Sequence, residues 1–387
     1  MLLVLVALPL AIYLVFLVVG SFPFLQKHFL YAHKINTLLW DNPDIPEAWG
    51  FAYNQVSPFT ISTPDGQSIY AWHILPLSLY APNQSAIARQ GSDAHVLDIT
   101  KSEGFRLLQQ DRNKKVVIYF HGNAGHLANS WRPQAYHALA TSSDYHVIAF
   151  DYRGFGRSTG SPTENGLITD ARAVIDWVMT VAEVPPENIV LFGHSLGTAV
   201  VSAALEHYTQ IGTVFAGTLL VAPFTSLPTL LTGYRILGTF PVLGPLYLFP
   251  SLQTWIQGFI WERWPTMKRL VEIARACPQG LRITLLHALD DCDIPHTETN
   301  SIFDAMMSIL SRGTDDELGD EPDEATVQYG NGGSVTTWTR QPDTVIQCIK
   351  FPYGGHNLIT TYAPVLLAIQ EFFSAVQGHS EAEVSGI

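Results

Sequence analysis

The sequence has 387 residues, enough for one large catalytic domain and an appendage. Hydrophobic residues make up 47% of it and charged residues only 14%, a balance that favours contact with a membrane or with lipid. The formal net charge of −13 and the lack of a basic stripe exclude nucleic-acid binding, and three scattered cysteines exclude a disulfide framework or a zinc site with CxxC spacing.

The N-terminus predicts a membrane anchor. Every residue of 2–19 is apolar or Tyr, the first charged side chain is Lys27, and a helix of about 20 such residues crosses a bilayer. We expect a transmembrane anchor over residues 1–25 and a juxtamembrane segment over 26–50. A cleaved signal peptide is the alternative, but the run lacks a basic start and exceeds the usual length of about 7 to 15 residues.

A β-hairpin is predicted next, because residues 59–63 and 68–73 are apolar-rich runs joined by the turn sequence Pro64-Asp65-Gly66. Residues 78–113 are mixed and polar, and we interpret them as an insertion. They include Asn83-Gln84-Ser85, which fits the acceptor pattern for N-glycosylation.

From residue 115 onward, short apolar runs alternate with longer helical patterns. Stretches such as 166–181 and 198–208 predict helices. Between them, strands are predicted at 116–120, 147–150, 189–192, 218–221, 283–286 and 346–351. This alternation predicts the α/β class, with a mainly parallel central sheet covered by helices on both faces.

Two insertions interrupt that pattern. Residues 224–265 are dense in apolar and aromatic side chains and poor in charge, so we expect a helical cap at about 224–275. Its aromatic residues could form an acyl-chain pocket, contact a membrane interface, or simply pack the cap on the sheet. A second insertion, at about 311–343, carries seven acidic residues between 315 and 324 and is predicted to be a disordered surface loop.

The strongest chemical motif is Gly193-His194-Ser195-Leu196-Gly197. It follows a predicted strand and precedes a predicted helix, the context that a G-x-S-x-G nucleophile elbow requires. In such a turn the serine is held in strained backbone geometry at a helix N-terminus, where developing negative charge is favoured. We therefore predict Ser195 as a nucleophile.

An oxyanion site is predicted beside it. The Gly-rich sequence His121-Gly122-Asn123-Ala124-Gly125 ends the strand at 116–120, and a loop of small residues there can offer a backbone N–H to an oxyanion. We expect the backbone N–H groups of Asn123 and Leu196 to be the donors. His121 itself is interpreted as structural.

A serine needs an imidazole to take its proton and a carboxylate to orient that imidazole. In this type of fold the chain order is Ser, acid, His. The strand near 283–286 is followed by Asp290, Asp291 and Asp293, of which we favour Asp291 as the acid and keep the other two as alternatives. His356 lies in a glycine-containing turn after the last strand and is predicted as the base.

Other histidines fit this role less well. His194 lies inside the elbow and points elsewhere, and His287 lies in an apolar strand and is interpreted as a core histidine. A metal site could use Asp291, Asp293, His296 and Glu298, but no second group of ligands has a recognisable spacing. We predict neither a metal nor a cofactor.

These motifs resemble those of the α/β-hydrolase superfamily. The motifs that carry this resemblance are His121-Gly-Asn-Ala-Gly125, Asp151-Tyr-Arg-Gly-Phe-Gly-Arg-Ser158, the elbow, the loop at 291–295 and Gly355-His356-Asn357. Together with the anchor and with Ala71-Trp72-His73, they resemble the membrane-anchored branch of monoacylglycerol and lysophospholipid lipases. The resemblance implies an α/β-hydrolase domain over 51–387 and the catalytic triad Ser195, Asp291 and His356.

The resemblance further implies hydrolysis of a single-chain lipid ester, with the catalytic domain in the lumen of the endoplasmic reticulum. The N-glycosylation pattern agrees with a lumenal domain, whereas Lys27 and Lys34 after the anchor favour the cytosol by the positive-inside rule. Two alternatives share the same motifs: a protein-acyl thioesterase or a prolyl-oligopeptidase-like peptidase, and, from another class, an inactive membrane-anchored scaffold. The expected partners are a lipid ester and the membrane.

Overall fold

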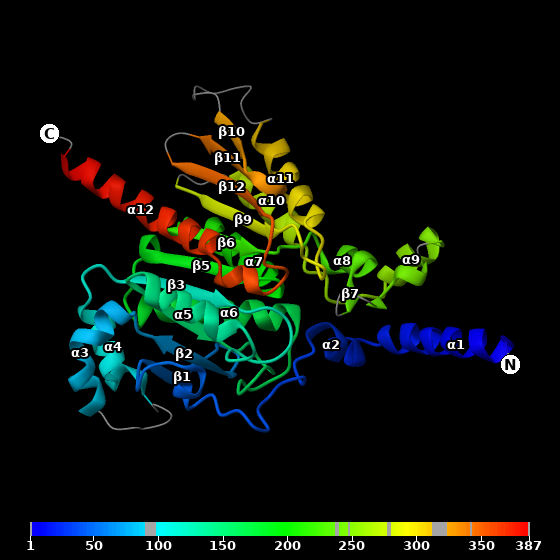
Figure 1. Cartoon of the computed structure of the whole chain (residues 1–387), viewed down its shortest axis with the longest axis horizontal. Coiled ribbons are helices and arrows are strands. Elements are labelled where there is room, and N and C mark those ends of the chain that lie inside the picture. The colour runs from blue at the N-terminus through cyan, green and yellow to red at the C-terminus, as the bar shows by residue number, and fades with distance from the viewer. Residues whose placement is uncertain are drawn as a thin grey trace.

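A ten-stranded sheet forms the centre of the protein (Figure 1). The computed structural model describes residues 2–89, 98–236, 240–246, 248–276, 280–311, 323–340 and 343–385. The strand order is β1-β2-β4-β3-β5-β6-β9-β12-β11-β10. These strands are β1 (Val56–Ser62), β2 (Ser68–Ile74), β3 (Lys115–Phe120), β4 (Tyr145–Phe150), β5 (Ile189–His194), β6 (Gly217–Val221), β9 (Arg282–Ala288), β10 (Asp323–Gln328), β11 (Ser334–Arg340) and β12 (Thr344–Phe351).

The middle of the sheet is parallel and its two margins are antiparallel. Strands β4, β3, β5, β6, β9 and β12 run parallel to one another, whereas β1 and β2 at one margin and β11 and β10 at the other pair in antiparallel fashion. Each residue of β4, β5, β6 and β9 is buried, as expected for strands covered on both faces. The α/β class and the six strands predicted from residue 115 onward are confirmed.

Helices cover both faces of this sheet (Figure 1). The buried faces of α4, α6, α7, α10 and α11 share one hydrophobic cluster, and those of α5 and α12 share the other. The helices are α1 (Leu2–Gly20), α2 (Pro23–Tyr31), α3 (Leu77–Arg89), α4 (Glu103–Gln110), α5 (Arg132–Ser142), α6 (Glu164–Thr180), α7 (Leu196–Gln210), α8 (Leu227–Gly233), α9 (Pro250–Gln257), α10 (Thr266–Ala276), α11 (Thr297–Leu310) and α12 (Ala363–Ser385).

The predicted hairpin is present, and the insertion after it is helical. Strands β1 and β2 pair from Val56 with Ile74 to Ser62 with Ser68. Residues 78–113 include α3 and α4, which bury Tyr80 and Leu107 in a small separate cluster. Asn83 of the glycosylation pattern lies on α3, where its amide nitrogen donates to the Leu79 carbonyl.

The expectation of a disordered surface loop over residues 311–343 is wrong for residues 323–340. Strands β10 and β11 form a hairpin there that extends the sheet beyond β12. β-branched residues support the pairing; Thr326 and Thr336, for example, are hydrogen-bonded across the strands at 3.0 Å. The acidic residues of 315–321 lie outside the described residues, and Asp323 and Glu324 stand on the exposed edge strand β10.

The cap consists of short elements inserted between β6 and β9. It includes α8, α9 and a small hairpin of β7 (Arg235–Ile236) and β8 (Phe240–Pro241). Helix α10 also falls within the range predicted for the cap, at 224–275, but its residues Leu270, Ile273 and Ala274 belong to the main core. The cap itself therefore ends before α10.

The N-terminal segment consists of two helices, of which α1 projects away from the sheet and α2 leads into the core (Figure 1). Helix α1 is apolar throughout, and α2 begins after a break at residues 21–22. Among the described helices, none satisfies both the length and the hydropathy of a membrane span by itself; residues 11–20 and 23–31 do so only as a pair bent by 102°. Tyr31, at the end of α2, is fully buried in the main core, so part of the predicted juxtamembrane segment belongs to the domain.

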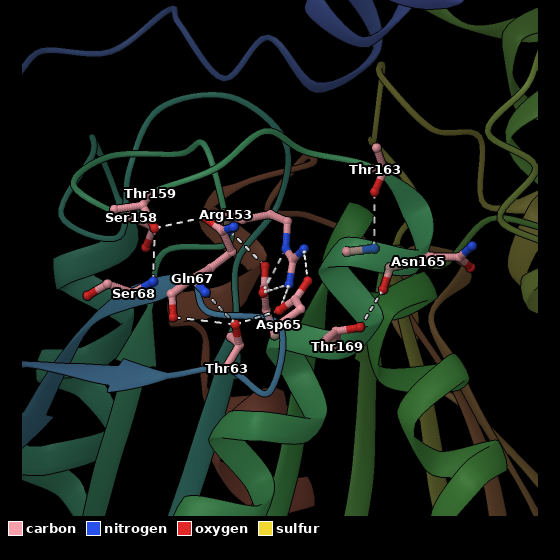
Figure 2. Close-up of polar contacts among 12 residues, drawn as sticks. Thr63, Asp65, Gln67, Ser68, Arg153, Ser158, Thr159, Thr163, Asn165 and Thr169 are labelled. Carbon is pink, nitrogen blue, oxygen red and sulfur yellow. Dashed lines mark hydrogen bonds and ion pairs between the residues drawn. The ribbon is translucent and has the colours of Figure 1, made fainter.

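An ion-pair network fixes the turn between β1 and β2. Figure 2 shows Arg153 reaching from the loop after β4 to Asp65 in that turn. The guanidinium donates to both carboxylate oxygens of Asp65, at 2.7 and 3.0 Å, and also to the buried carboxylate of Asp170 on α6. The hydrogen bonds from Arg153 and Thr63 lower the pKa of Asp65 to about 2.

This low pKa predicts a stability difference that depends on pH. The folded pKa lies below the ordinary value of 3.8, so the Asp65 carboxylate stabilises the fold above about pH 4, and this contribution is lost as the pH falls toward 2. Asp65 is half-exposed, so solvent screening limits the contribution of its carboxylate to the free energy of unfolding to about 1 kcal/mol. We expect Asp65→Asn to lower the free energy of unfolding by about that amount at pH 7 and by less at pH 3. Urea denaturation at both pH values checks this, and an equal loss at both would contradict it.

Candidate active site

Ser195 occupies the junction between β5 and α7 in strained geometry. Its backbone has φ 53° and ψ −118°, a conformation that costs a non-glycine residue of order 1–3 kcal/mol and persists only where the surroundings impose it. The serine N–H donates to the Val221 carbonyl of the neighbouring strand β6 at 2.9 Å, which holds the turn against the sheet. This is the geometry predicted for a nucleophile elbow.

The two glycines of the motif are required by close packing. A Cβ atom at Gly193 would lie 2.7 Å from the Gly197 carbonyl oxygen, and one at Gly197 would overlap the carbonyl oxygen of Phe120 in β3. Gly122, in the adjacent loop, is similarly confined, because its Cβ would lie 3.3 Å from the Cβ of Ser195. Side chains are thus excluded from the space where the elbow meets the loop of residues 121–125, here called the oxyanion loop.

We predict that Gly197→Ala destabilises the fold severely. The added methyl group meets backbone, which cannot move without shifting β3, so we expect a loss of about 3 kcal/mol or more. Gly233→Ala is the matched control, because nothing lies within 4 Å of a Cβ at that position. Thermal unfolding of the wild type, Gly197→Ala and Gly233→Ala measures the effect. Similar melting temperatures for the two variants would contradict the prediction.

Asp291 and His356 form a hydrogen-bonded pair. Nδ1 of His356 lies 2.8 Å from Oδ2 of Asp291, whose side chain is fully buried. The backbone N–H groups of Asp293 and Ile294 donate to the other carboxylate oxygen, Oδ1. Burial opposes ionisation, but hydrogen bonds from His287 and His356 hold the pKa of Asp291 well below its usual value. Asp291 is therefore a carboxylate that orients the imidazole of His356.

The neighbouring aspartates are placed differently. Asp290 accepts hydrogen bonds from the backbone N–H groups of Gly355, at 2.7 Å, and Gly354, at 3.3 Å, so it holds the turn that carries His356. Asp293 lines the same cavity as His356, and burial raises the pKa of its carboxyl group. Among the described residues, Asp291 alone of these three aspartates is hydrogen-bonded to the imidazole of His356.

The other two histidines near the site are held by structural contacts. Nε2 of His194 donates to the backbone carbonyl of His356 at 2.8 Å, and burial lowers the pKa of His194 well below its ordinary value. His287 is buried, with its ring between Thr299 and the Ile294 carbonyl, and it also lies 3.2 Å from Asp291. His287 thus supports the acid of the pair, a contact that the sequence did not reveal.

The oxyanion loop brings two unpaired donors to the elbow. The backbone N–H groups of Asn123 and Leu196 have no hydrogen-bond partner among the described residues, and both residues line the cavity that contains Ser195. The buried Arg132 side chain donates to the carbonyls of Gly122, Asn123 and Ala124 and so holds the loop from behind. Such free, fixed donors are what a developing oxyanion requires.

A cavity of about 600 Å³ opens at this point. Apolar residues of α1, α2 and the cap form most of its wall, and the predicted site residues Ser195, His356, Asn123 and Leu196 line one part of it. Asp291 lies behind His356. In the described part of the chain no hydrogen bond joins Ser195 Oγ to His356; catalytic contacts of this kind often tighten only when substrate is bound.

Besides the contact of His287 with Asp291, the sequence did not reveal three further contributions to the site. Arg132 and Asp290 act on the backbone of loops that carry other residues, and a residue that binds carbonyl or N–H groups leaves no motif. The third is the part of the cavity wall formed by α1 and α2, helices that lie within the predicted anchor and juxtamembrane segment. Their apolar composition, shared with the cap, was the available signal.

Comparison with known proteins defines the class. The family described as "alpha/beta hydrolase fold" matches residues 115–251. The chain is also 33% identical over 320 residues to the human protein ABHD12B, covering 82% of this chain and 72% of that protein. The chain therefore belongs to the α/β-hydrolase superfamily.

Among its relatives are the lysophosphatidylserine lipases ABHD12 of Xenopus tropicalis and Danio rerio, 31% and 27% identical over 205 and 261 residues. These matches cover 53% and 65% of this chain, and the chain spans only 48% and 59% of those two relatives. A crystal structure of an alpha-beta hydrolase from Vibrio vulnificus has the same fold, with a TM-score of 0.56 at 14% identity over 90% of this chain and 92% of that one.

Proposed function

We propose that this protein is a membrane-associated serine hydrolase that cleaves carboxylic esters of single-chain lipids, either monoacylglycerols or lysophospholipids. The observation that carries the proposal is the position of Ser195, His356 and two free backbone donors in one apolar cavity. A cavity of about 600 Å³ with a mostly hydrophobic wall suits one acyl chain with its ester at the polar end. The lipase names of the relatives agree with this substrate class.

The reaction proceeds through an acyl-enzyme. Ser195 Oγ attacks the ester carbonyl while its proton passes to Nε2 of His356, and Asp291 stabilises the imidazolium that forms. The N–H groups of Asn123 and Leu196 hold the oxyanion. His356 then protonates the leaving alcohol, and water, activated by the same imidazole, releases the fatty acid and restores Ser195. Neither step uses a metal or a cofactor.

The charges of the cavity bear on the head group. Two of the residues that line it are charged, Arg132 and Asp293. The two terminal nitrogens of the Arg132 guanidinium are hydrogen-bonded to backbone carbonyls, so among the described lining residues no Lys or Arg side chain extends freely toward an anionic head group. Monoacylglycerols are therefore expected to be hydrolysed at least as fast as anionic lysophospholipids.

We also propose membrane attachment through the N-terminal helices, with the catalytic domain in the lumen of the endoplasmic reticulum. Apolar side chains are exposed along α1 and on α2, including Ile12, Val15 and Phe24, and on the cap at Trp255 and Trp261. Tryptophan at the edge of such a surface is typical of a membrane interface. A glycosidase-sensitive mass that disappears in Asn83→Gln would support the lumenal side, and an unmodified Asn83 in a eukaryotic host would argue against it.

A substrate comparison tests the reaction. The purified full chain is assayed for kcat/KM with a monoacylglycerol, two lysophospholipids, a protein-acyl thioester and a peptide amide, with Ser195→Ala as the blank. The proposal expects the lipid esters to be hydrolysed at least about 100-fold faster than the other two. The peptide amide has no acyl chain to fill the apolar cavity, and the thioester brings a whole protein to a site walled by α1, α2 and the cap. Faster cleavage of the thioester would favour a thioesterase, and of the amide a peptidase.

A further inference from the structure

Residues 30–35, here called the strap, lie directly against the oxyanion loop. The side-chain amide of Asn123 donates to the Leu30 carbonyl at 2.6 Å. The N–H of Ala124 donates to the Tyr31 carbonyl at 3.1 Å, and the N–H of Gly125 to that of Ile35 at 2.9 Å. Three successive residues of the loop are thus held by the end of α2 and the segment that follows it.

The strap is in turn fixed to the cap. The hydroxyl of Tyr31 lies 3.0 Å from the Glu262 carboxylate and accepts a hydrogen bond from the indole of Trp264 at 3.2 Å. Earlier in α2, Gln26 donates to the Phe259 carbonyl and accepts from the N–H of Trp261. The N-terminal helices, the cap and the oxyanion loop therefore form one hydrogen-bonded unit.

These contacts bear on catalysis because they set the position of a donor. Arg132 donates to the carbonyl groups of the loop, and the strap accepts from the N–H groups of Ala124 and Gly125. The N–H of Asn123, just before these two residues, has no partner among the described residues. An oxyanion donor acts through its fixed position, and a displacement of about 1 Å can cost roughly 100-fold in rate. Arg132 alone does not fix both sides of the loop.

We infer that the strap is a positioning element of the oxyanion site, so that the N-terminal helices are required for turnover as well as for attachment. The inference rests on the proposed hydrolase function for its chemistry. It concerns residues that the motifs of the fold do not include, since the strap precedes the first strand of the sheet.

The matched pair Tyr31→Phe and Tyr208→Phe tests it. Both tyrosines are 1% exposed, and both hydroxyl groups are hydrogen-bonded to a carboxylate, that of Tyr208 to Asp176 on α6. In the full chain we expect Tyr31→Phe to lower kcat for a water-soluble short-chain ester about 10-fold with KM within about twofold of wild type. Tyr208→Phe should leave both constants unchanged, although its melting temperature falls by a similar amount.

A transition-state analogue distinguishes positioning from general damage. A short-chain trifluoromethyl ketone forms a hemiketal with the serine, and its oxyanion needs the same donors as the reaction. Its inhibition constant should rise in Tyr31→Phe by the factor by which kcat falls. Asn123→Ala, which keeps the backbone N–H but removes the bond to Leu30, should show the same pattern.

Two outcomes would overturn the inference. One is that Tyr31→Phe and Asn123→Ala lose no more kcat than Tyr208→Phe. The other is a rise in KM with kcat and the inhibition constant unchanged, which would make the strap only a wall of the binding cavity. Failure of the proposed function is read from the wild-type chain alone: it would hydrolyse no ester, or it would prefer the thioester or the amide in the substrate comparison.

Discussion

Ser195→Ala is expected to lower kcat for a lipid ester by on the order of 10⁶-fold while the protein stays folded. The estimate follows from a nucleophile and base that act as one unit, so that removing either member abolishes the covalent route. The small side chain of alanine fits the strained elbow, whose backbone is fixed by its bond to Val221. The measurement is single-turnover hydrolysis together with labelling by a fluorophosphonate probe.

The control for this variant is Ser202→Ala. Ser202 is buried on the same helix α7, and its hydroxyl donates to the Thr198 carbonyl at 2.7 Å. It should label as the wild type does. If an intact Ser195→Ala protein labelled as strongly as wild type, the nucleophile would have to be a different residue, and the proposed mechanism would fail with it.

Asp291→Asn is expected to lower kcat by about 10⁴-fold. The amide group cannot replace a carboxylate that is bonded to Nδ1 of His356, and it favours the wrong tautomer of the imidazole. The low pKa of Asp291 means that the wild-type group remains ionised throughout the neutral and mildly acidic range. The loss should therefore be of similar size from pH 6 to pH 8, as measured by kcat profiles of both proteins.

The neighbouring aspartates provide the comparison. Asp290→Asn weakens the contacts to Gly354 and Gly355, so a moderate loss of about 10-fold is expected. Asp293→Asn should change head-group preference more than kcat, because Asp293 lines the cavity without contacting the imidazole by a hydrogen bond. A larger loss in either of these variants than in Asp291→Asn would move the role of the acid to that residue.

The central sheet and the elbow could be predicted because each has a local cause in the sequence. Strands such as β3 and β5 are runs of β-branched and aromatic residues, which mark a sheet buried on both faces. The glycine at position 193 is dictated by the backbone of Gly197 and Thr198 in the same turn, whereas the glycine at 197 faces Phe120 of β3 and is recognised in the sequence through its fixed spacing from Ser195. The order of serine, acid and histidine then restricted the remaining partners to two loops.

The remaining features depend on contacts between distant parts of the chain. Nothing near Tyr31 in the sequence indicates that its carbonyl receives a hydrogen bond from Ala124, about 90 residues away. The hairpin of β10 and β11 was missed for a different reason. Its flanking acidic residues dominate the composition and predict an unstructured loop, whereas the pairing depends on the neighbouring strand β12.

The β10–β11 hairpin also changes the surroundings of His356, the proposed base. Strand β12 leads directly to the turn that carries His356, and without the hairpin it would be the last strand of the sheet. Terminal strands fray more readily than interior ones. With β11 paired to it, and with Asn331 donating to the hydroxyl of Tyr353 just before that turn, β12 is shielded from fraying. A hairpin whose outer strand is exposed and whose inner strand places Trp338 in the core therefore also steadies the turn that carries His356, the proposed base.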